Sequence, residues 1–290
     1  LEVKLTRASI AINTVKAELD KEDATIGHVR ITSFAKNTAE ELEKSVKDLT
    51  DKGAKAFVFD VRYNPGGLLD QAYKVANMFL KDGEPIVQVE DRFGEKKIYK
   101  ASSSIGEFKI TQPYVLLVNE GSASASEILA AAIKEGAGGQ IVGTKTYGKG
   151  TVQSVVDITD NSELKYTNAK WLTPKGNWIH KEGVTPTKEV NLPDYAFLKI
   201  IDARETLKVG SVSQNVLSVE TILKGLGYSV TADGYFDEAT KNAVKSYQQK
   251  EGLTATGEVD EETAQKLMDS VRELIQQNDT QYQAAKELLK

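Results

Sequence analysis

Short apolar runs alternate with segments whose apolar residues recur every three or four positions, and this alternation organises the first two thirds of the chain. Apolar or alternating runs bounded by turn residues predict strands, and three-to-four spacing predicts helices. The predicted strands are 1–8, 27–32, 56–61, 85–90, 97–101, 114–118, 140–144, 151–158 and 164–172. The predicted helices are 38–53, 68–80 and 124–134. This order of elements favours a layered mixed α/β core.

The first of these helices carries signals at both ends. Thr38-Ala39-Glu40-Glu41 matches the pattern of a capping box, in which the threonine and the second glutamate satisfy each other's free backbone N–H groups. Gly53 follows the last periodic residue and is expected to end the helix.

The character of the chain changes near residue 205. Two similar segments, 233–240 and 256–263, each place an aspartate, Asp237 or Asp260, at a predicted helix N-cap. The sequence therefore predicts a small all-α helical module with an internal near-repeat, followed by one polar helix that faces a partner. Residues 1–20 are expected to be the strand and linker that follow an upstream domain, and residues 21–205 the core. Residues 206–270 are expected to form the module, and residues 271–290 the C-terminal helix.

Composition removes several classes of function. The 290 residues are 40% apolar and 27% charged, with a net charge of −5, which gives no basic face for nucleic acid. No cysteine is present, so disulfides, thiolate catalysis and thiolate metal sites are excluded. His28 and His180 are the only histidines, and neither is expected to be catalytic. We expect no metal and no cofactor.

A small-residue turn, Gly121-Ser-Ala-Ser-Ala-Ser-Glu-Ile128, joins a buried strand to a helix. A serine at the start of a helix can attack a carbonyl while neighbouring N–H groups hold the oxyanion. The same residues, Ser124 to Glu127, also form a capping-box pattern, so Ser124 is either a nucleophile or a plain N-cap. The segment alone leaves both interpretations open.

A second glycine-rich segment, 143–153, nearly matches a phosphate-binding loop. Gly150 stands where serine or threonine would bind magnesium, and a strand follows where a helix is required, so we set nucleotide binding aside. A lysine between two glycines, Lys149, remains. It is either a solvated turn residue or, if desolvated, a base that the neutral amide of Gln153 could orient.

The third segment, Asp60-Val-Arg-Tyr-Asn-Pro-Gly-Gly67, follows another buried strand. Alone it fits an ordinary strand-to-helix turn. Together, the three segments each place a glycine-rich turn at the end of a strand, which is where α/β proteins usually build their sites.

Four motifs in the chain resemble those of the carboxyl-terminal processing, or tail-specific, serine proteases. They appear in that family's order: DVRYNPGG (60–67), NEGSASASEI (119–128), GTKTYGKGTVQ (143–153) and KWLTPKGNWIHKEGVTP (170–186). The resemblance covers roughly residues 1 to 190. It implies a core similar to the ClpP/crotonase fold and an endopeptidase that cleaves protein substrates near unstructured C-termini.

The resemblance also implies the site. The family's Ser-Lys-Gln triad falls on Ser124, Lys149 and Gln153, and one oxyanion donor falls on the N–H of Ala125. The second donor falls on Gly66 or Gly67, which the sequence does not separate. The family pattern gives Ser122 and Ser126 structural roles. Tyr63 departs from the family's usual Asn or Gly, and the family's PDZ domain is absent from this chain.

Residues 226–253 resemble a small peptidoglycan-binding domain. Val219-Glu220 replaces that family's usual Leu-Gln pair, which argues against glycan binding and for a role in homodimerisation. The combination points to the envelope of a Gram-positive bacterium, with the protein secreted or membrane-associated.

Two rival functions remain. One is an inactive envelope protein that has a degenerate protease core and binds the cell wall. The other is an acyl-CoA enzyme of the crotonase class, although no feature of the sequence is specific to CoA.

Overall fold

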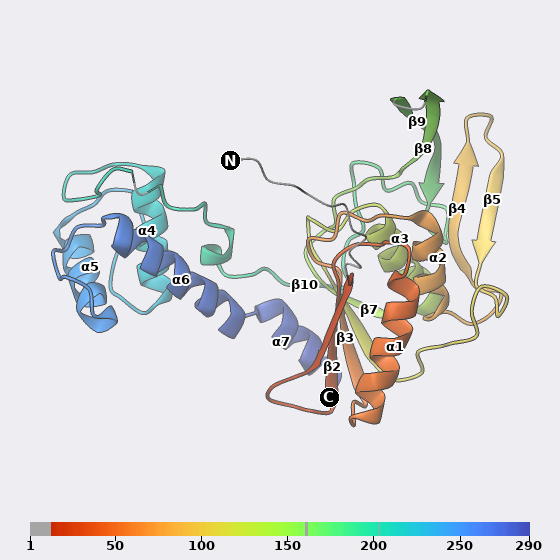
Figure 1. Ribbon diagram of the computed structural model, residues 1–290, viewed down its shortest axis with the longest axis horizontal. Coiled ribbons are helices and arrows are strands. Elements are labelled where there is room, and N and C mark those ends of the chain that lie inside the picture. Colours follow the sequence, from red (N-terminus) through yellow and green to blue (C-terminus); the bar gives the residue numbers. More distant parts are fainter. Residues whose placement is uncertain (1–12, 160–161, 203) are drawn as a thin grey trace, which may run out of the picture. The chain divides into compact units, whose positions relative to one another are not determined.

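The computed structural model describes residues 13–159, 162–202 and 204–290, which form two compact units (Figure 1). The first unit extends to Asn191 and also includes Gln281–Lys290, and the second spans Leu192–Thr280. The strand predicted over residues 1–8 lies outside the described residues. The boundary at Leu192 precedes the change of sequence character near residue 205.

The first unit contains two sheets and their covering helices. Its strands are β1 (Val15–Leu19), β2 (Ile26–Ile31), β3 (Ala56–Asp60), β4 (Pro85–Asp91), β5 (Lys96–Lys100), β6 (Tyr114–Val118), β7 (Gln140–Gly143), β8 (Thr151–Thr159), β9 (Ser162–Leu172) and β10 (Lys188–Glu189). Its helices are α1 (Thr38–Asp51), α2 (Leu69–Asn77), α3 (Ala125–Ala131), the π-helical turn η1 (Ala132–Ala137) and α7 (Thr280–Glu287). The mixed α/β core is as predicted.

The larger sheet brings the three glycine-rich turns to one edge. Its strand order is β1-β2-β3-β6-β7-β10, and every pair except β1–β2 is parallel. The carboxyl ends of β3, β6 and β7 therefore meet at the same edge. Turns 60–67, 119–124 and 143–150 follow these three strands, so segments far apart in the sequence become neighbours.

The two faces of this sheet are covered differently because successive strand residues point to opposite faces. Phe57, Phe59 and Leu116 belong to the cluster that includes buried residues of α1, α2 and α3. Val58, Val115 and Leu117 belong to a second cluster that includes buried alanines of α7. Burial on both faces explains why β3 and β6 are apolar throughout.

The C-terminal segment differs from the prediction of one polar, partner-facing helix over 271–290. The chain forms α6 (Glu261–Gln277), breaks, and then forms α7. Ala284 and Ala285 of α7 are buried against the sheet of the first unit. Polar and charged residues together outnumber these two alanines in α7, so its apolar face has a weak sequence signal.

The capping box predicted at Thr38 is also wrong. Asn37 occupies the N-cap, and the Thr38 hydroxyl lies within hydrogen-bond distance of the Thr14 hydroxyl, at 2.6 Å. Glu41 accepts hydrogen bonds from the backbone N–H groups of Thr14 and Val15 instead of reaching back to the cap. A contact between α1 and the start of β1 thus replaces the local motif.

The smaller sheet has the order β5-β4-β9-β8, and β8 and β9 form the hairpin predicted around residues 160–161. The second unit contains the short helix η2 (Asp194–Phe197), α4 (Gln214–Gly225), α5 (Glu238–Glu251) and α6 around its own core. Asp237 and Asp260 cap α5 and α6, as predicted, by accepting hydrogen bonds from Thr240 N and Thr263 N. Within the described residues, no helix has the length and apolar character needed to cross a membrane.

Candidate active site

Hydrogen bonds join the turn after β3 to the turn after β6. The Ser122 hydroxyl donates to Val61 O at 2.8 Å, and the Ser126 hydroxyl donates to Asn64 O at 2.9 Å. Both serines are fully buried. They therefore have the structural roles expected of them, and they fix the backbone around Ser124, which lies between them.

Ser124 occupies the N-cap position of α3, but its hydroxyl does not cap the helix. Its backbone has φ of 55° and ψ of −111°, a conformation that residues with a Cβ rarely adopt. The expected capping-box arrangement of Ser124 and Glu127 is present, but its firm contact is the Ser124 N–H donating to Glu127 Oε2 at 2.9 Å, and the Ser124 hydroxyl forms no cap hydrogen bond. The hydroxyl is therefore free for another role, on a sharp strand-to-helix turn of the kind that exposes a nucleophile.

Two backbone N–H groups near Ser124 have no hydrogen-bond partner among the described residues: those of Ala125 and Gly67. The N–H of Gly66 is engaged because it donates to Asn64 Oδ1 at 2.9 Å. A Cβ built on Gly66 would lie 2.9 Å from Ala125 N and 2.9 Å from Ser124 Cβ. The Gly66-Gly67 turn thus passes directly over the start of α3, where an oxyanion would need its donors.

Lys149 is half-buried between β7 and β8. Its backbone N–H donates to Glu127 Oε2 at 2.8 Å, and its carbonyl accepts a hydrogen bond from Trp171 Nε1 at 2.8 Å. Within the described ranges, no hydrogen bond or ion pair involves Lys149 Nζ, so no carboxylate neutralises the amine. The structure joins Lys149 to Ser124 through Glu127, and no side-chain hydrogen bond links the two directly.

Gln153 lies on β8, where it pairs with Thr167 of β9, and its side chain is exposed. No hydrogen bond connects the Gln153 amide with Lys149 in the described part of the chain. The arrangement therefore contains the turn that carries Ser124 and two backbone N–H groups without partners among the described residues, whereas no hydrogen bond joins the side chain of Lys149 or Gln153 to Ser124. Catalytic contacts are often loose before substrate binds.

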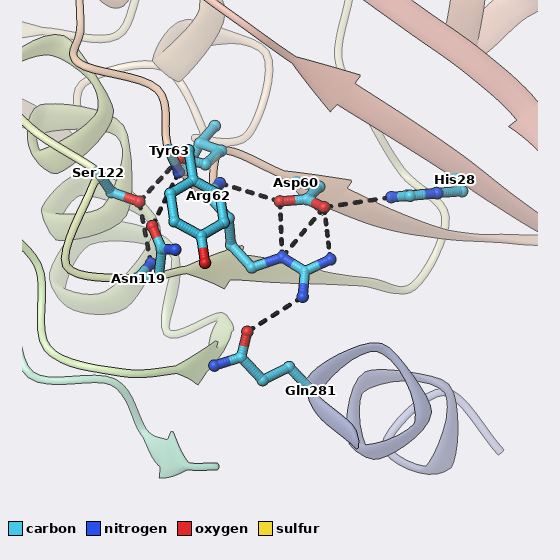
Figure 2. A network of polar contacts seen from close by, with 8 residues as sticks. His28, Asp60, Arg62, Tyr63, Asn119, Ser122 and Gln281 are labelled. Carbon is cyan, nitrogen blue, oxygen red and sulfur yellow. Dashed lines mark hydrogen bonds and ion pairs between the residues drawn. The ribbon is translucent and has the colours of Figure 1, made fainter. Parts of the chain in front are cut away.

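A buried charge network supports the base of the 60–67 turn (Figure 2). Asp60 accepts hydrogen bonds from Arg62 and lies 3.5 Å from His28 Nε2, and the Arg62 guanidinium also donates to Gln281 of α7. Burial alone would raise the pKa of Asp60, but His28 and Arg62 outweigh that effect and hold the pKa well below its usual value. His28 is therefore a structural residue.

Some residues that shape the site gave little or no chemical signal in the sequence. In the sequence, Glu127 is recognisable only as half of a capping box, but its carboxylate also accepts hydrogen bonds from the backbone N–H groups of Gly148 and Lys149. Trp178 Nε1 donates to Gly150 O at 3.0 Å, and the Trp178 ring stacks on His180, with ring centroids 5.2 Å apart. The motif over 170–186 contains both Trp178 and His180, but it gave no signal for the contact of Trp178 with Gly150 of the 143–153 segment.

Comparison with known proteins identifies both parts of the chain. Residues 25–190 match the model of peptidase family S41, and residues 212–267 match a peptidoglycan binding domain. The carboxy-terminal processing protease CtpA of Bacillus subtilis (strain 168) is 42% identical over 290 residues, which cover 100% of this chain and 61% of CtpA. CtpB of the same organism is 37% identical over 98% of this chain and 60% of its own length.

The solved structure of a photosystem II D1 C-terminal processing protease is also similar. It has 35% sequence identity and a TM-score of 0.54, and the match covers 64% of this chain and 50% of that one. The chain thus spans about three fifths of the length of the two Bacillus relatives. The family match covers more than half of the chain, its fold agrees with that of the D1 protease, and the chain belongs to peptidase family S41.

Proposed function

We propose that this chain is the catalytic part of a serine endopeptidase that cleaves protein substrates near unstructured C-termini. Ser124 is the nucleophile, Lys149 the general base, and Gln153 orients the lysine amine once substrate is bound. The N–H groups of Ala125 and Gly67 hold the oxyanion. Membership of family S41 and the relatives named for carboxy-terminal processing support this reaction class.

The reaction proceeds through an acyl-enzyme. Ser124 Oγ attacks the peptide carbonyl carbon while the Lys149 amine takes the hydroxyl proton. The carbonyl oxygen becomes an oxyanion between the two N–H groups. When the C–N bond breaks, Lys149 passes its proton to the departing amine, and water then hydrolyses the ester by the reverse roles.

One observation carries the proposal. Ser124 adopts a strained backbone conformation at the start of α3, and its hydroxyl forms no hydrogen bond that caps the helix. Strain of about 1–3 kcal/mol persists at a residue only where the surroundings impose it, and it concentrates at functional sites. The free N–H of Ala125 beside this hydroxyl supports the role of nucleophile.

Cleavage of an unstructured polypeptide by the purified protein tests the assignment. Ser124→Ala and Lys149→Ala should each abolish cleavage and leave the thermal unfolding transition unchanged. Lys145→Ala, which removes an exposed lysine from the same loop, should retain activity. Cleavage by Ser124→Ala at the wild-type rate would refute the assignment, and an inactive wild-type protein would favour the rival, a non-enzymatic wall-binding protein.

We further propose that the second unit places the enzyme at the cell wall of a Gram-positive envelope. Val219 and Glu220, which depart from the peptidoglycan-binding pattern, are both fully buried. Glu220 accepts from Gly234 N and the Thr240 hydroxyl, so this departure belongs to the core and does not argue against glycan binding. Sedimentation with purified peptidoglycan tests the idea; no retention, together with a dimer in solution, would favour dimerisation.

A further inference from the structure

Glu127 is a buried carboxylate that the proposed reaction does not use. Its side chain has no exposed area, and it accepts hydrogen bonds from four donors on two segments of the chain. These donors are Ser124 N at 2.9 Å, Thr146 Oγ1 at 2.6 Å, Gly148 N at 2.6 Å and Lys149 N at 2.8 Å. Within the described residues, no lysine, arginine or histidine pairs with it, so neutral donors alone hold it.

The two residues proposed for catalysis share one oxygen of this carboxylate. Oε2 accepts hydrogen bonds from the backbone N–H groups of both Ser124 and Lys149, at 2.9 Å and 2.8 Å. The two backbone nitrogens are therefore held close together around one oxygen atom. Oε1 accepts from Thr146 and Gly148, which brings the rest of the lysine loop to the same point. A single side chain thus joins the turn after β6 to the loop after β7.

The other backbone groups of both residues are also fixed. The Ser124 carbonyl accepts from Glu127 N and Ile128 N in the first turn of α3, and the Lys149 carbonyl accepts from Trp171 Nε1. With the backbone of both residues held in this way, rotation of the two side chains is the main motion left to change the distance between Ser124 Oγ and Lys149 Nζ.

We propose that Glu127 is a positioning residue that sets the distance and orientation between the nucleophile and the base of this enzyme. The inference rests on the proposed function because it assigns Ser124 and Lys149 their roles. It goes further because it states what position 127 requires: a side chain in which both oxygens accept hydrogen bonds. A glutamine would turn its NH₂ group toward at least one N–H donor and could not accept from both sides.

The test compares Glu127→Gln with Glu41→Gln. Glu41 is a matched control because its carboxylate also accepts from two backbone N–H groups, those of Thr14 and Val15, but it lies outside the site. Steady-state cleavage gives kcat and KM, and native-state hydrogen exchange gives the protection of the Ser124 and Lys149 amide protons. The second readout does not depend on cleavage.

Glu127→Gln should lower kcat at least about 100-fold, as expected when reacting groups are displaced by about 1 Å, while KM stays within about threefold. The Ser124 and Lys149 amides should lose protection while the amides of β3 keep theirs. Glu41→Gln should retain wild-type kcat.

A Glu127→Gln enzyme with wild-type kcat, or with both amides still protected, would overturn the proposal. If Glu127→Gln does not fold, Glu127→Asp decides in the same way, because the shorter side chain keeps the charge but cannot reach both segments. A wild-type protein that cleaves nothing would refute the proposed function, and the exchange data would still test the contact.

Discussion

Replacing Gly66 by alanine perturbs the proposed oxyanion site at one atom. Gly66 has a φ of +101°, and a Cβ there would lie 2.8 Å from Ala123 O, 2.9 Å from Ala125 N and 2.9 Å from Ser124 Cβ. None of these neighbours is the flexible end of a side chain. The new methyl group would therefore displace the turn or cover the N–H of Ala125.

The expected effect of Gly66→Ala has two contributions to the free energy of unfolding and one to kcat. A positive φ at a residue with a Cβ costs about 1–2 kcal/mol, and forcing a methyl group into a packed site adds about 1–3 kcal/mol. We therefore expect Gly66→Ala to lower the free energy of unfolding by about 2–5 kcal/mol. Losing one oxyanion donor should lower kcat by about 100- to 1,000-fold.

Gly53→Ala is the matched control. Gly53 has a φ of +105°, but nothing lies within 4 Å of its added Cβ, so this variant reports the backbone strain alone. Urea denaturation and peptide cleavage are measured on both variants below their unfolding transitions. Gly53→Ala should lose about 1–2 kcal/mol and keep its kcat. If Gly66→Ala keeps wild-type kcat, the oxyanion site is not beneath this turn.

Other parts of the structure give further predictions. Arg62→Met leaves the Asp60 carboxylate buried without its main partner and should lower the free energy of unfolding by about 3–5 kcal/mol in urea denaturation. Because the folded pKa of Asp60 is depressed, its stabilising contribution is present above about pH 4 and should be lost as the pH falls below that value, a loss that Asp60→Asn should not show in thermal melts. Burial raises the pKa of Glu220, so its carboxylate lowers the free energy of unfolding increasingly as the pH rises above about 4. Glu220→Gln should therefore melt at a higher temperature than the wild type at pH 7, and at the same temperature below about pH 4. Ala285→Glu places a charge in the contact between α7 and the sheet and should lower the melting temperature of the first unit, whereas Glu287→Ala on the exposed side of α7 should not.

The central strands β3 and β6 were predictable because the sheet is buried on both faces there, which makes each of them a continuous apolar run, whereas the mostly exposed β1 was not predicted. Residues 114–118 were predicted with the bounds that β6 has, and β3 differs by one residue. The hairpin of β8 and β9 was predictable from alternation and its turn. These signals are local and need no tertiary information.

Other features depend on distant partners and were therefore hidden. Thr38 and Glu41 match a capping box, but hydrogen bonds to Thr14 replaced it. Helix α7 is polar by composition, and its apolar face against the sheet consists of Ala284 and Ala285 with the partly buried Tyr282. Tertiary contacts override local propensity in both cases.

The residues assigned to the site remain a prediction, and the sequence did not predict how they are arranged. Glycine-rich turns at strand ends and the family motifs pointed to Ser124, Lys149 and the Gly66-Gly67 turn. The hydrogen bond from Gly66 N to Asn64 leaves Gly67 as the turn's available donor, and the sequence contains no signal for that difference. The second role of Glu127 is similarly hidden because its donors lie about 20 residues away in sequence.

Mapping the covalent adduct of a peptidyl phosphonate ester tests the central claim most directly, because such a reagent mimics the acylation step and marks the attacking atom. Digestion and mass spectrometry of the labelled protein should find the phosphonyl group on Ser124, with labelling strongly reduced in Lys149→Ala. An adduct on any other residue, or undiminished labelling of Ser124→Ala, would contradict the account.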